Sequence, residues 1–364
     1  MRVLVVNAGS STLKLRLLGQ DDRVEAAHDV DPWAGEADAS VLEPVRDALA
    51  AADAVGHRVV HGGTEFTAAV LVDDGVIDRI EALTPLAPLH QPRSVAAIRA
   101  VGSALPSTPA VACFDTAFHA EMPESAATYA VPRDWIARWG VRRFGFHGLS
   151  HAYAAQRAAE LLGRPLVGLR MVTCHLGAGA SLCAVRDGRS VDTTMGFTPL
   201  EGLVMATRSG TVDPGLVLWL VTHAGLPAAE VTEALERSSG LAGLSATSGD
   251  MREVVAGAAA GDRAAVLALE VYVHRLRREI GAMVAVLGGL HALVFTGGIG
   301  EHQPSIRAAA AEGLGFLGVA LDAEANAATA ADGDLSAPGA SARTLVVTAR
   351  EDVEIARQVR RVLA

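Results

Sequence analysis

A strand, small-residue turn and second strand occur twice in the chain, and this repeat constrains the fold more than any other feature. The first copy is MRVLVVNAGSSTLKLRLL at residues 1–18, in which an apolar run ends in Asn-Ala-Gly-Ser-Ser and an alternation of polar and apolar residues follows. Such period-two alternation is typical of a half-buried strand. The second copy is MVTCHLGAGASLCAV at residues 171–185. One copy in each half of the chain predicts two similar α/β domains.

The turns of both copies suit phosphate. Backbone amides that no bulky side chain covers can approach phosphate oxygens, and Ser, Thr and Lys side chains donate to them. An ordinary hairpin with a polar loop would explain either copy alone. The recurrence favours phosphate, as does Lys14, which is the only Lys in the chain. We therefore expect both loops to bind the same phosphate chain.

Composition excludes several classes of protein. The chain has 364 residues, of which 50% are hydrophobic, and a net charge of −10. It has no basic run, which argues against nucleic acid or an anionic membrane as the main partner. Its three Cys have no paired spacing, and no signal-peptide pattern opens the chain, so we expect a cytoplasmic protein. The apolar zone 281–295 is too short and too broken by glycine to span a bilayer, and it predicts a helix end, a turn and a core strand.

Two charged residues lie near the ends of predicted strands. Arg58 stands in GHRVVHGG, and Asp115 follows the apolar run of PAVACFDTAFH. Ligands bind at the carboxyl ends of strands in α/β proteins, and the planar fork of Arg suits carboxylate or phosphate. A core ion pair for Arg58 and a helix-capping role for Asp115 remain alternatives.

The sequence RRFGFHGLSH places His147 and His151 four residues apart. A zinc helix of the HExxH type needs Glu where Gly148 stands, so we reject zinc. Ser150 is expected to cap a helix that begins at His151, whereas His147 is better placed to point into a cleft.

The second half of the chain carries three further polar loops. Arg208 stands in a Ser/Thr/Gly loop, SGDMR ends another loop, and GGIGE reads as a turn between a strand and a helix. Residues 321–342 are low in complexity and are expected to form a surface loop. The last helix should begin at Glu351, whose carboxylate is either a helix-start acid or a metal ligand.

Taken together, these motifs resemble the acetate kinase family. The matching stretches span residues 7–356 in order: NAGSSTLK, GHRVVHGG, LAPLH, FDTAFH, FGFHG, CHLGAGASL, MGFTPLEGL, TRSGTVDP, SGDMR, GGIGE and EDVEIA. The resemblance implies a duplicated actin/hexokinase-like (ribonuclease H-like) α/β fold with an interdomain cleft, and a homodimer. The N-terminal domain would comprise residues 1–119 plus 353–364, and the C-terminal nucleotide-binding domain residues 120–352. The implied reaction is reversible, Mg²⁺-dependent phosphoryl transfer from ATP to acetate, which gives acetyl phosphate and ADP; Mn²⁺ is an alternative ion.

The resemblance also implies roles for individual residues. Residues that act on the carboxylate and the transferring phosphoryl group would be Arg58, Asp115, His147 and Arg208. Asn7 and Glu351 would hold or orient the metal ion. The acyl pocket would be lined by Arg58, Val60, Leu89, Phe146 and Pro199. The phosphate path and the adenosine pocket would be formed by Ser10, Thr12, Lys14, His90, His175, Gly177, Gly179, Asp250, Met251, Arg252, Gly298, Ile299 and Gly300.

The chain departs from the family pattern at four positions. Ala178 and His302 stand where Asn is usual, Gln91 replaces Asn, and Thr12 replaces Ser. Thr12 keeps the hydroxyl, whereas Ala178 removes a possible phosphate contact and so affects efficiency more than the reaction itself.

Two other functions compete with acetate phosphorylation. One is a propionate-preferring or pyrophosphate-using relative; the SGDMR and GGIG motifs favour a nucleotide over pyrophosphate. The other is an actin-like ATPase or ATP-binding regulator without acyl transfer, which would have no need of Arg58, Arg208 and His147 together.

Overall fold

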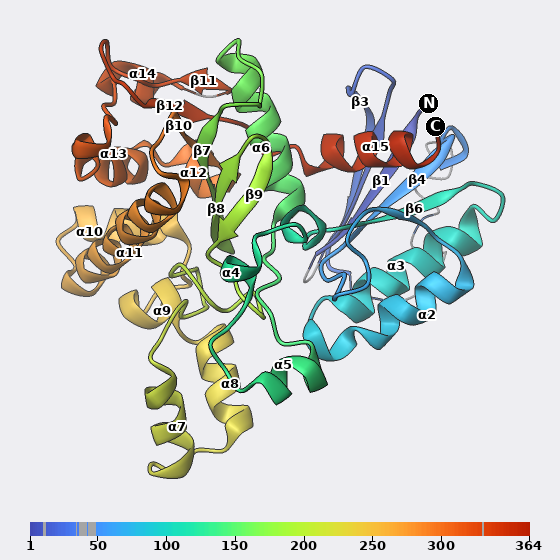
Figure 1. The fold of residues 1–364 in the computed structure, drawn as a ribbon, viewed down its shortest axis with the longest axis horizontal. Coiled ribbons are helices and arrows are strands. Elements are labelled where there is room, and N and C mark those ends of the chain that lie inside the picture. Colours follow the sequence, from blue (N-terminus) through green and yellow to red (C-terminus); the bar gives the residue numbers. More distant parts are fainter. Residues whose placement is uncertain (10–11, 34, 36–41, 43–48, 330) are drawn as a thin grey trace. The chain divides into compact units, whose positions relative to one another are not determined.

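The computed structural model describes residues 1–9, 12–33, 35, 42, 49–329 and 331–364, which form two compact units. Unit 1 comprises Met1–Ala120, Phe146–Tyr153 and Arg350–Ala364, and unit 2 comprises Glu121–Gly145 and Ala154–Ala349. Each unit is built on a six-stranded sheet covered by helices (Figure 1). The predicted α/β class is therefore confirmed.

The sheet of unit 1 has the strand order β3-β2-β1-β4-β6-β5. Its strands are β1 (Val3–Ala8), β2 (Leu13–Leu18), β3 (Val24–Val30), β4 (Ala54–Val59), β5 (Val70–Leu71) and β6 (Ala110–Phe114). β1, β4 and β6 are parallel neighbours, whereas β2, β3 and β5 pair antiparallel. The carboxyl ends of β1, β4 and β6 therefore meet at one edge of the sheet.

Helices cover both faces of this sheet, α3 on one face and α15 on the other (Figure 1). In the described part of unit 1 the bounded helical segments are α2 (Asp74–Ala82), η2 (Thr84–Leu86), α3 (Gln91–Ala104), η3 (Ala117–His119) and α15 (Glu351–Val362), together with the start of α6 (Gly148–Leu161). A Cβ added to Gly56 in β4 would lie 2.5 Å from Ile355 and 2.8 Å from Val359, so glycine lets α15 pack directly on the strand. Leu4, Val6 and other apolar side chains of the opposite face pack with α3.

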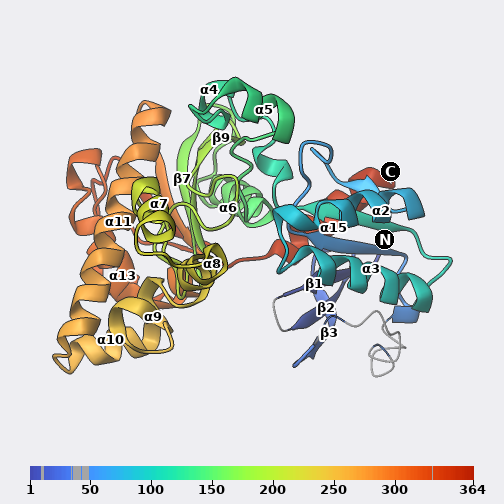
Figure 2. The ribbon, with the colours of Figure 1, turned by 90° about the horizontal axis from the view of Figure 1, so that it is seen from below.

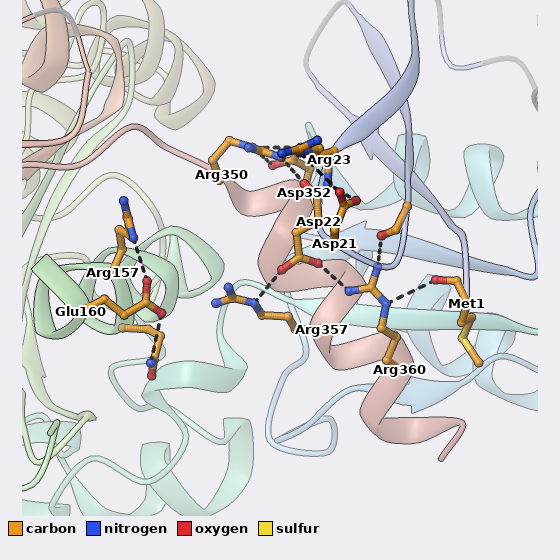
Figure 3. Close-up of polar contacts among 12 residues, drawn as sticks. Met1, Asp21, Asp22, Arg23, Arg157, Glu160, Arg350, Asp352, Arg357 and Arg360 are labelled. Atoms are coloured by element: carbon orange, nitrogen blue, oxygen red, sulfur yellow. Dashed lines mark hydrogen bonds and ion pairs between the residues drawn. The ribbon is translucent and has the colours of Figure 1, made fainter.

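The turn between β2 and β3 anchors α15 (Figure 3). The Asp22 carboxylate accepts from Arg357 at 3.2 Å and from Arg360 at 2.5 Å, and its carbonyl accepts from Arg350 at 3.1 Å. Arg360 also donates to the carbonyl of Gly19 at 2.6 Å. A charged network with several members fixes geometry better than an isolated surface pair does. It therefore holds the helix whose first residue is Glu351.

The sheet of unit 2 has the order β11-β12-β10-β7-β8-β9. Its strands are β7 (Arg170–Leu176), β8 (Ala180–Arg186), β9 (Arg189–Thr193), β10 (Ala292–Thr296), β11 (Gly333–Asp334) and β12 (Arg343–Val346). β7, β10 and β12 are parallel, and β8, β9 and β11 pair antiparallel. Read from β9, the order and directions repeat those of unit 1 read from β3, as the repeated sequence pattern predicts.

The longest helix of unit 2, α11 (Arg263–Leu287), packs against β7, β8 and β9, and Figure 2 shows it on one side of the sheet with α6 on the other. Asp262 caps its start by accepting from Ala264 at 2.8 Å. The other helical segments are α4 (Glu124–Ala127), α5 (Arg133–Trp139), α7 (Pro214–Thr222), α8 (Ala228–Arg237), α9 (Gly240–Ser245), α10 (Met251–Ala259), α12 (Gly297–His302), α13 (Pro304–Glu312), η4 (Gly315–Leu317) and α14 (Ala323–Ala328).

Three local predictions have clear outcomes. Residues 281–295 form a helix end, a turn and the core strand β10, as expected. The prediction that α6 begins at His151 with Ser150 as its cap is wrong: the helix begins at Gly148, because the Gly148 amide bonds to the Asp115 carbonyl at 2.9 Å.

The prediction of a surface loop at residues 321–342 is also wrong, because Asp322 caps α14 there and β11 follows. None of the helices in the described part of the chain is both long and apolar enough to cross a lipid bilayer.

Candidate active site

Three predicted site residues share one face and one edge of the unit 1 sheet. Side chains alternate along a strand, so Arg58, two residues after Gly56, points to the same face as α15. Asn7 lies near the end of β1, Arg58 near the end of β4, and Asp115 directly after β6. Glu351 enters the same face as the first residue of α15. Period-two alternation and parallel pairing thus gather four polar side chains at one place.

Arg58 is the centre of this cluster. Its Nε and Nη2 donate to the two carboxylate oxygens of Asp115 at 3.1 and 2.6 Å, and Nη1 donates to Asn7 Oδ1 at 3.1 Å. Asn7 Nδ2 donates to Glu351 Oε2 at 3.5 Å, and the same carboxylate oxygen lies 4.0 Å from Arg58 Nε. A guanidinium has five N–H groups, so these contacts leave two for the oxygens of an anionic ligand.

The electrostatics keep Arg58 charged and in place. Burial by itself would lower the pKa of its guanidinium, but the Asp115 and Glu351 carboxylates outweigh burial and the pKa is raised. Asp115 is only 1% exposed, so it depends on Arg58 for compensation of its charge. Arg58 thus forms the core ion pair that the sequence allowed as an alternative. The pair lies at the carboxyl ends of the strands, where a ligand would bind.

The donor set of Asn7 and Glu351 fits a magnesium ion. Mg²⁺ takes oxygen ligands, keeps several waters and is bound through one or two carboxylates together with substrate phosphates. Asn7 and Glu351 supply an amide oxygen and a carboxylate, and the Glu351 side chain is 17% exposed. Among the described residues no group of three or more His, Cys, Asp or Glu could hold a metal, so a closed protein cage is not present there.

The predicted acyl-pocket residues of unit 1 differ in exposure. Val60 and Phe146 are buried, at 6% and 1% exposed, whereas Leu89 is 40% exposed. The ring of His61 meets that of Phe146 edge to face, with centroids 5.4 Å apart. His147 follows directly, partly exposed, with a φ of +57°.

The first predicted phosphate loop is only partly described. Lys14 is exposed on β2, opposite Asn7 in the antiparallel register. The Thr12 carbonyl accepts from the Gly9 amide at 2.7 Å, which closes the turn. Ser10 lies outside the described residues. His90 is partly buried immediately before α3, which begins at Gln91.

The second predicted phosphate loop joins β7 to β8 in unit 2. The Gly177 amide donates to the Gly179 carbonyl at 2.9 Å, which makes a tight turn after His175. The carbonyl of Ala178 accepts from the Ala206 amide at 3.1 Å. The turn is thus held to the loop that leads to Arg208.

Arg208 has a neutral partner. Its Nη1 donates to the Pro199 carbonyl at 2.7 Å. Burial lowers the pKa of its guanidinium, and Glu236 acts in the opposite direction without reversing the shift. The loop that carries Pro199 is fixed by Glu201, which accepts from Arg143 at 2.7 Å and from Tyr129 at 2.5 Å. Sequence reasoning missed these contacts, since Tyr129 stands outside the recognised motifs and nothing in the motifs that contain Arg143 and Glu201 marks the two as partners.

The predicted adenosine residues lie at two helix starts of unit 2. Asp250 caps α10 and binds Arg252, whose side-chain hydrogen bond lowers the pKa of that carboxyl to about 2. Met251 is buried, at 3% exposed. Gly298 is exposed, with no atom within 4 Å of an added Cβ, so a flat ring could lie against its backbone. Ile299 is partly exposed and Gly300 is buried in the same short helix, α12.

Comparison with known proteins identifies the same family as the sequence motifs do. The model of the acetokinase family matches residues 36–357. An acetate kinase from Deinococcus deserti is 48% identical, over 100% of this chain and 98% of that protein. An acetate kinase from Nostoc punctiforme is 47% identical, over 88% of this chain and 78% of that protein.

Solved structures give the same result. The crystal structure of Porphyromonas gingivalis acetate kinase matches 100% of both chains with a TM-score of 0.93 at 35% identity. A propionate kinase from Francisella tularensis matches 99% of both chains with a TM-score of 0.92 at 34% identity. The predicted resemblance and the duplicated fold are confirmed.

Proposed function

The chain belongs to the acetokinase family, and on this premise we propose the residues with which it phosphorylates acetate. The reaction is reversible: an acetate oxygen forms a bond to the γ-phosphorus of ATP, the bond from that phosphorus to the leaving oxygen of ADP breaks, and acetyl phosphate results. ATP and ADP are the nucleotide co-substrates of the family.

The observation that carries the residue assignment is the cluster of Asn7, Arg58, Asp115 and Glu351. Acetate is already a competent nucleophile, so the enzyme needs no strong base. It needs to position the reactants and to place positive charge on the three equatorial phosphoryl oxygens. Arg58, oriented by the bidentate contact with Asp115, supplies such charge with two N–H groups still available.

The remaining roles follow the same chemistry. Arg208 binds oxygens of the transferring phosphoryl group, and His147 donates to the transition state. The glycine turn at Gly177–Gly179 offers backbone amides to phosphate, and Val60 and Phe146 enclose the methyl group of acetate. Asp250, Met251, Arg252 and the turn at Gly298–Gly300 receive adenosine.

Asn7 and Glu351 would hold Mg²⁺, with Mn²⁺ as a substitute. When bound, the ion neutralises charge on the nucleotide phosphates. Glu351→Gln keeps the shape of the side chain and removes its charge, so the concentration of Mg²⁺ needed for half-maximal rate should rise. An unchanged requirement would contradict the assignment of Glu351.

Three further features belong to this proposal. The protein acts as a homodimer and in the cytoplasm. The division into a domain of residues 1–119 plus 353–364 and a nucleotide-binding domain of residues 120–352 stays a prediction.

The test is ADP release with acetate, propionate, butyrate or no acid, with acetyl phosphate measured as hydroxamate. We expect acetate to give the highest kcat/KM and the control without acid to be nearly silent. Rapid ATP hydrolysis without acid would instead favour an actin-like ATPase. A higher kcat/KM for propionate would make propionate, which is one methylene longer, the preferred substrate in place of acetate. Activity with pyrophosphate alone would overturn the assignment of ATP as the phosphoryl donor.

A further inference from the structure

We propose that His119 is a positioning residue that aims the imidazole of His147, an inference that rests on the catalytic role proposed for His147. The two rings belong to different segments of unit 1, since His119 ends η3 and His147 directly precedes α6. His119 Nε2 lies 3.0 Å from the carbonyl oxygen of Phe146, the residue before His147. The His119 ring also meets the ring of His151 in α6 edge to face, with centroids 5.8 Å apart.

The backbone at His147 is the reason that positioning matters. His147 has a φ of +57°, a left-handed conformation that residues with a side chain rarely adopt. Such conformations persist where surrounding contacts fix them, and they gather at functional sites. The backbone sets the direction of the His147 Cα–Cβ bond, so whatever holds the backbone here helps to aim the imidazole.

The two peptide planes that flank His147 are both held. In the plane after it, the Gly148 amide donates to the Asp115 carbonyl at 2.9 Å and the His147 carbonyl accepts from the His151 amide at 2.9 Å. A Cβ at Gly148 would lie 2.1 Å from the Asp115 oxygen, so this approach requires glycine. In the plane before it, the Phe146 carbonyl accepts from His119. Backbone groups hold one plane, and a side chain holds the other.

The chemistry of His119 suits a fixed donor. A carbonyl oxygen only accepts, so Nε2 must carry the proton in this contact. His119 is fully buried, and burial lowers the pKa of its imidazole to about 4 despite the bond to Phe146. The ring is therefore neutral and keeps one tautomer at physiological pH. It serves as a permanent donor and takes no part in proton transfer.

Substitutions at His119 show whether the site needs a hydrogen-bond donor at the position of Nε2 or any polar side chain. The amide nitrogen of Gln can replace Nε2, whereas that of Asn lies closer to the position of Nδ1. We expect His119→Leu and His119→Asn to lower kcat by about 10- to 100-fold, the scale of a 1 Å misplacement near the chemistry, with KM for ATP nearly unchanged. His119→Gln should recover most of kcat. Equal kcat for the Gln and Asn variants would overturn the proposal.

The same substitution in a His147→Ala variant shows whether His119 acts through His147. If it does, adding His119→Leu to His147→Ala should change kcat by less than about threefold, because the ring to be aimed is absent. If the two losses multiply, His119 acts independently and the proposal fails. The control is Val101→Ala in α3, a buried core truncation in the same unit, which should lower the melting temperature and leave kcat of the folded enzyme unchanged.

The outcomes also distinguish this inference from the proposed function. Near-normal turnover in His147→Ala would overturn the catalytic role of His147 and this inference with it. An inactive His147→Ala beside a fully active His119→Leu would overturn the positioning role alone.

Discussion

The two units bury different kinds of side chain, although their sheets have the same strand order. Among the described residues, all of the buried histidines and carboxylates lie in unit 1: His57, His61, Asp115, His119, His151 and Glu354. In unit 2 the buried polar groups are mostly hydroxyls, and Arg307 is the buried charged residue. One topology thus supports an ionisable core in one unit and a nearly neutral core in the other.

The two candidate arginines show what this difference means for function. Arg58 is held by a buried counter-charge, and its pKa is raised by Asp115 and Glu351 in spite of burial. Arg208 is held by the Pro199 carbonyl, and burial lowers its pKa. A guanidinium with a buried carboxylate has a fixed position, whereas one bound to a neutral carbonyl can exchange that partner for an incoming anion. Arg58 therefore carries a structural task that Arg208 lacks.

The largest expected effect is on catalysis by both arginines. Arg58→Ala and Arg208→Ala should each lower kcat by about 10³-fold or more, since each removes charge that acts on the phosphoryl group in the transition state. Steady-state kinetics on folded protein would measure the loss. Near-normal turnover in either variant would remove that arginine from the site.

Stability should separate the same two variants. Arg58→Ala removes the bidentate cationic contact of the buried Asp115 carboxylate, and breaking a buried ion pair typically costs about 3–5 kcal/mol. Arg208→Ala removes one hydrogen bond to a neutral carbonyl, worth about 1–3 kcal/mol at most. Denaturant unfolding would therefore show a clear loss for Arg58→Ala and a smaller one for Arg208→Ala. Equal losses would contradict the contrast between the units.

A second difference is the response to acid. His57 is buried on the α3 face of β4, neither ring nitrogen has a hydrogen-bond partner among the described residues, and burial lowers its pKa to about 3. The unfolded chain would protonate this ring near pH 6.5, so the unfolded state binds more protons between pH 6.5 and pH 3. The stabilising effect of a neutral His57 is therefore complete above pH 6.5. It decreases as the pH is lowered from 6.5 towards 3, by up to about 1.4 kcal/mol per pH unit.

His57→Leu should thus reduce the loss of stability between pH 7 and pH 5 by about 2 kcal/mol. Hydrogen exchange at pH 5 should also show unit 1 of the unaltered protein opening before unit 2. The matched control is His274→Leu at an exposed position on α11 of unit 2, which makes the same substitution without changing the buried core of unit 1. An unaltered slope in His57→Leu would mean that this ring is protonated without cost in the folded protein.

The smallest expected effect concerns the acyl group. Val60→Ala enlarges a buried position in unit 1 and should raise kcat/KM for propionate relative to acetate by roughly 10-fold, since one methylene in an apolar pocket is worth about 1–3 kcal/mol. Pro199→Ala in unit 2 keeps the carbonyl that binds Arg208 and should change the ratio less. A larger shift from Pro199→Ala would assign acyl selection to unit 2.

Periodicity and turn residues predicted much of this structure. Alternation at residues 12–18 gave the second strand, and Gly288 marked the end of α11. The family motifs supplied the candidate arginines, but the pairing of Arg58 with Asp115 joins positions 57 residues apart and depends on strand order. The Asp22 network could not be predicted, because it joins a turn to a helix more than 320 residues later. His119 stands in a recognised motif, and its contact with Phe146 depends on the path of the chain after η3.

The anchoring of α15 has a consequence for the order of events during synthesis. The sheet of unit 1 is made from the first 120 residues, but the helix that covers one of its faces comes from the last 15. When every strand of that sheet has left the ribosome, Glu351 and the arginines that bind Asp22 have not yet emerged. Unit 1 therefore has one apolar face uncovered until α15 has been synthesised, and chaperones have that interval in which to bind it. A message truncated before codon 350 would yield a chain that keeps Arg58 and Asp115 but lacks the helix that covers them.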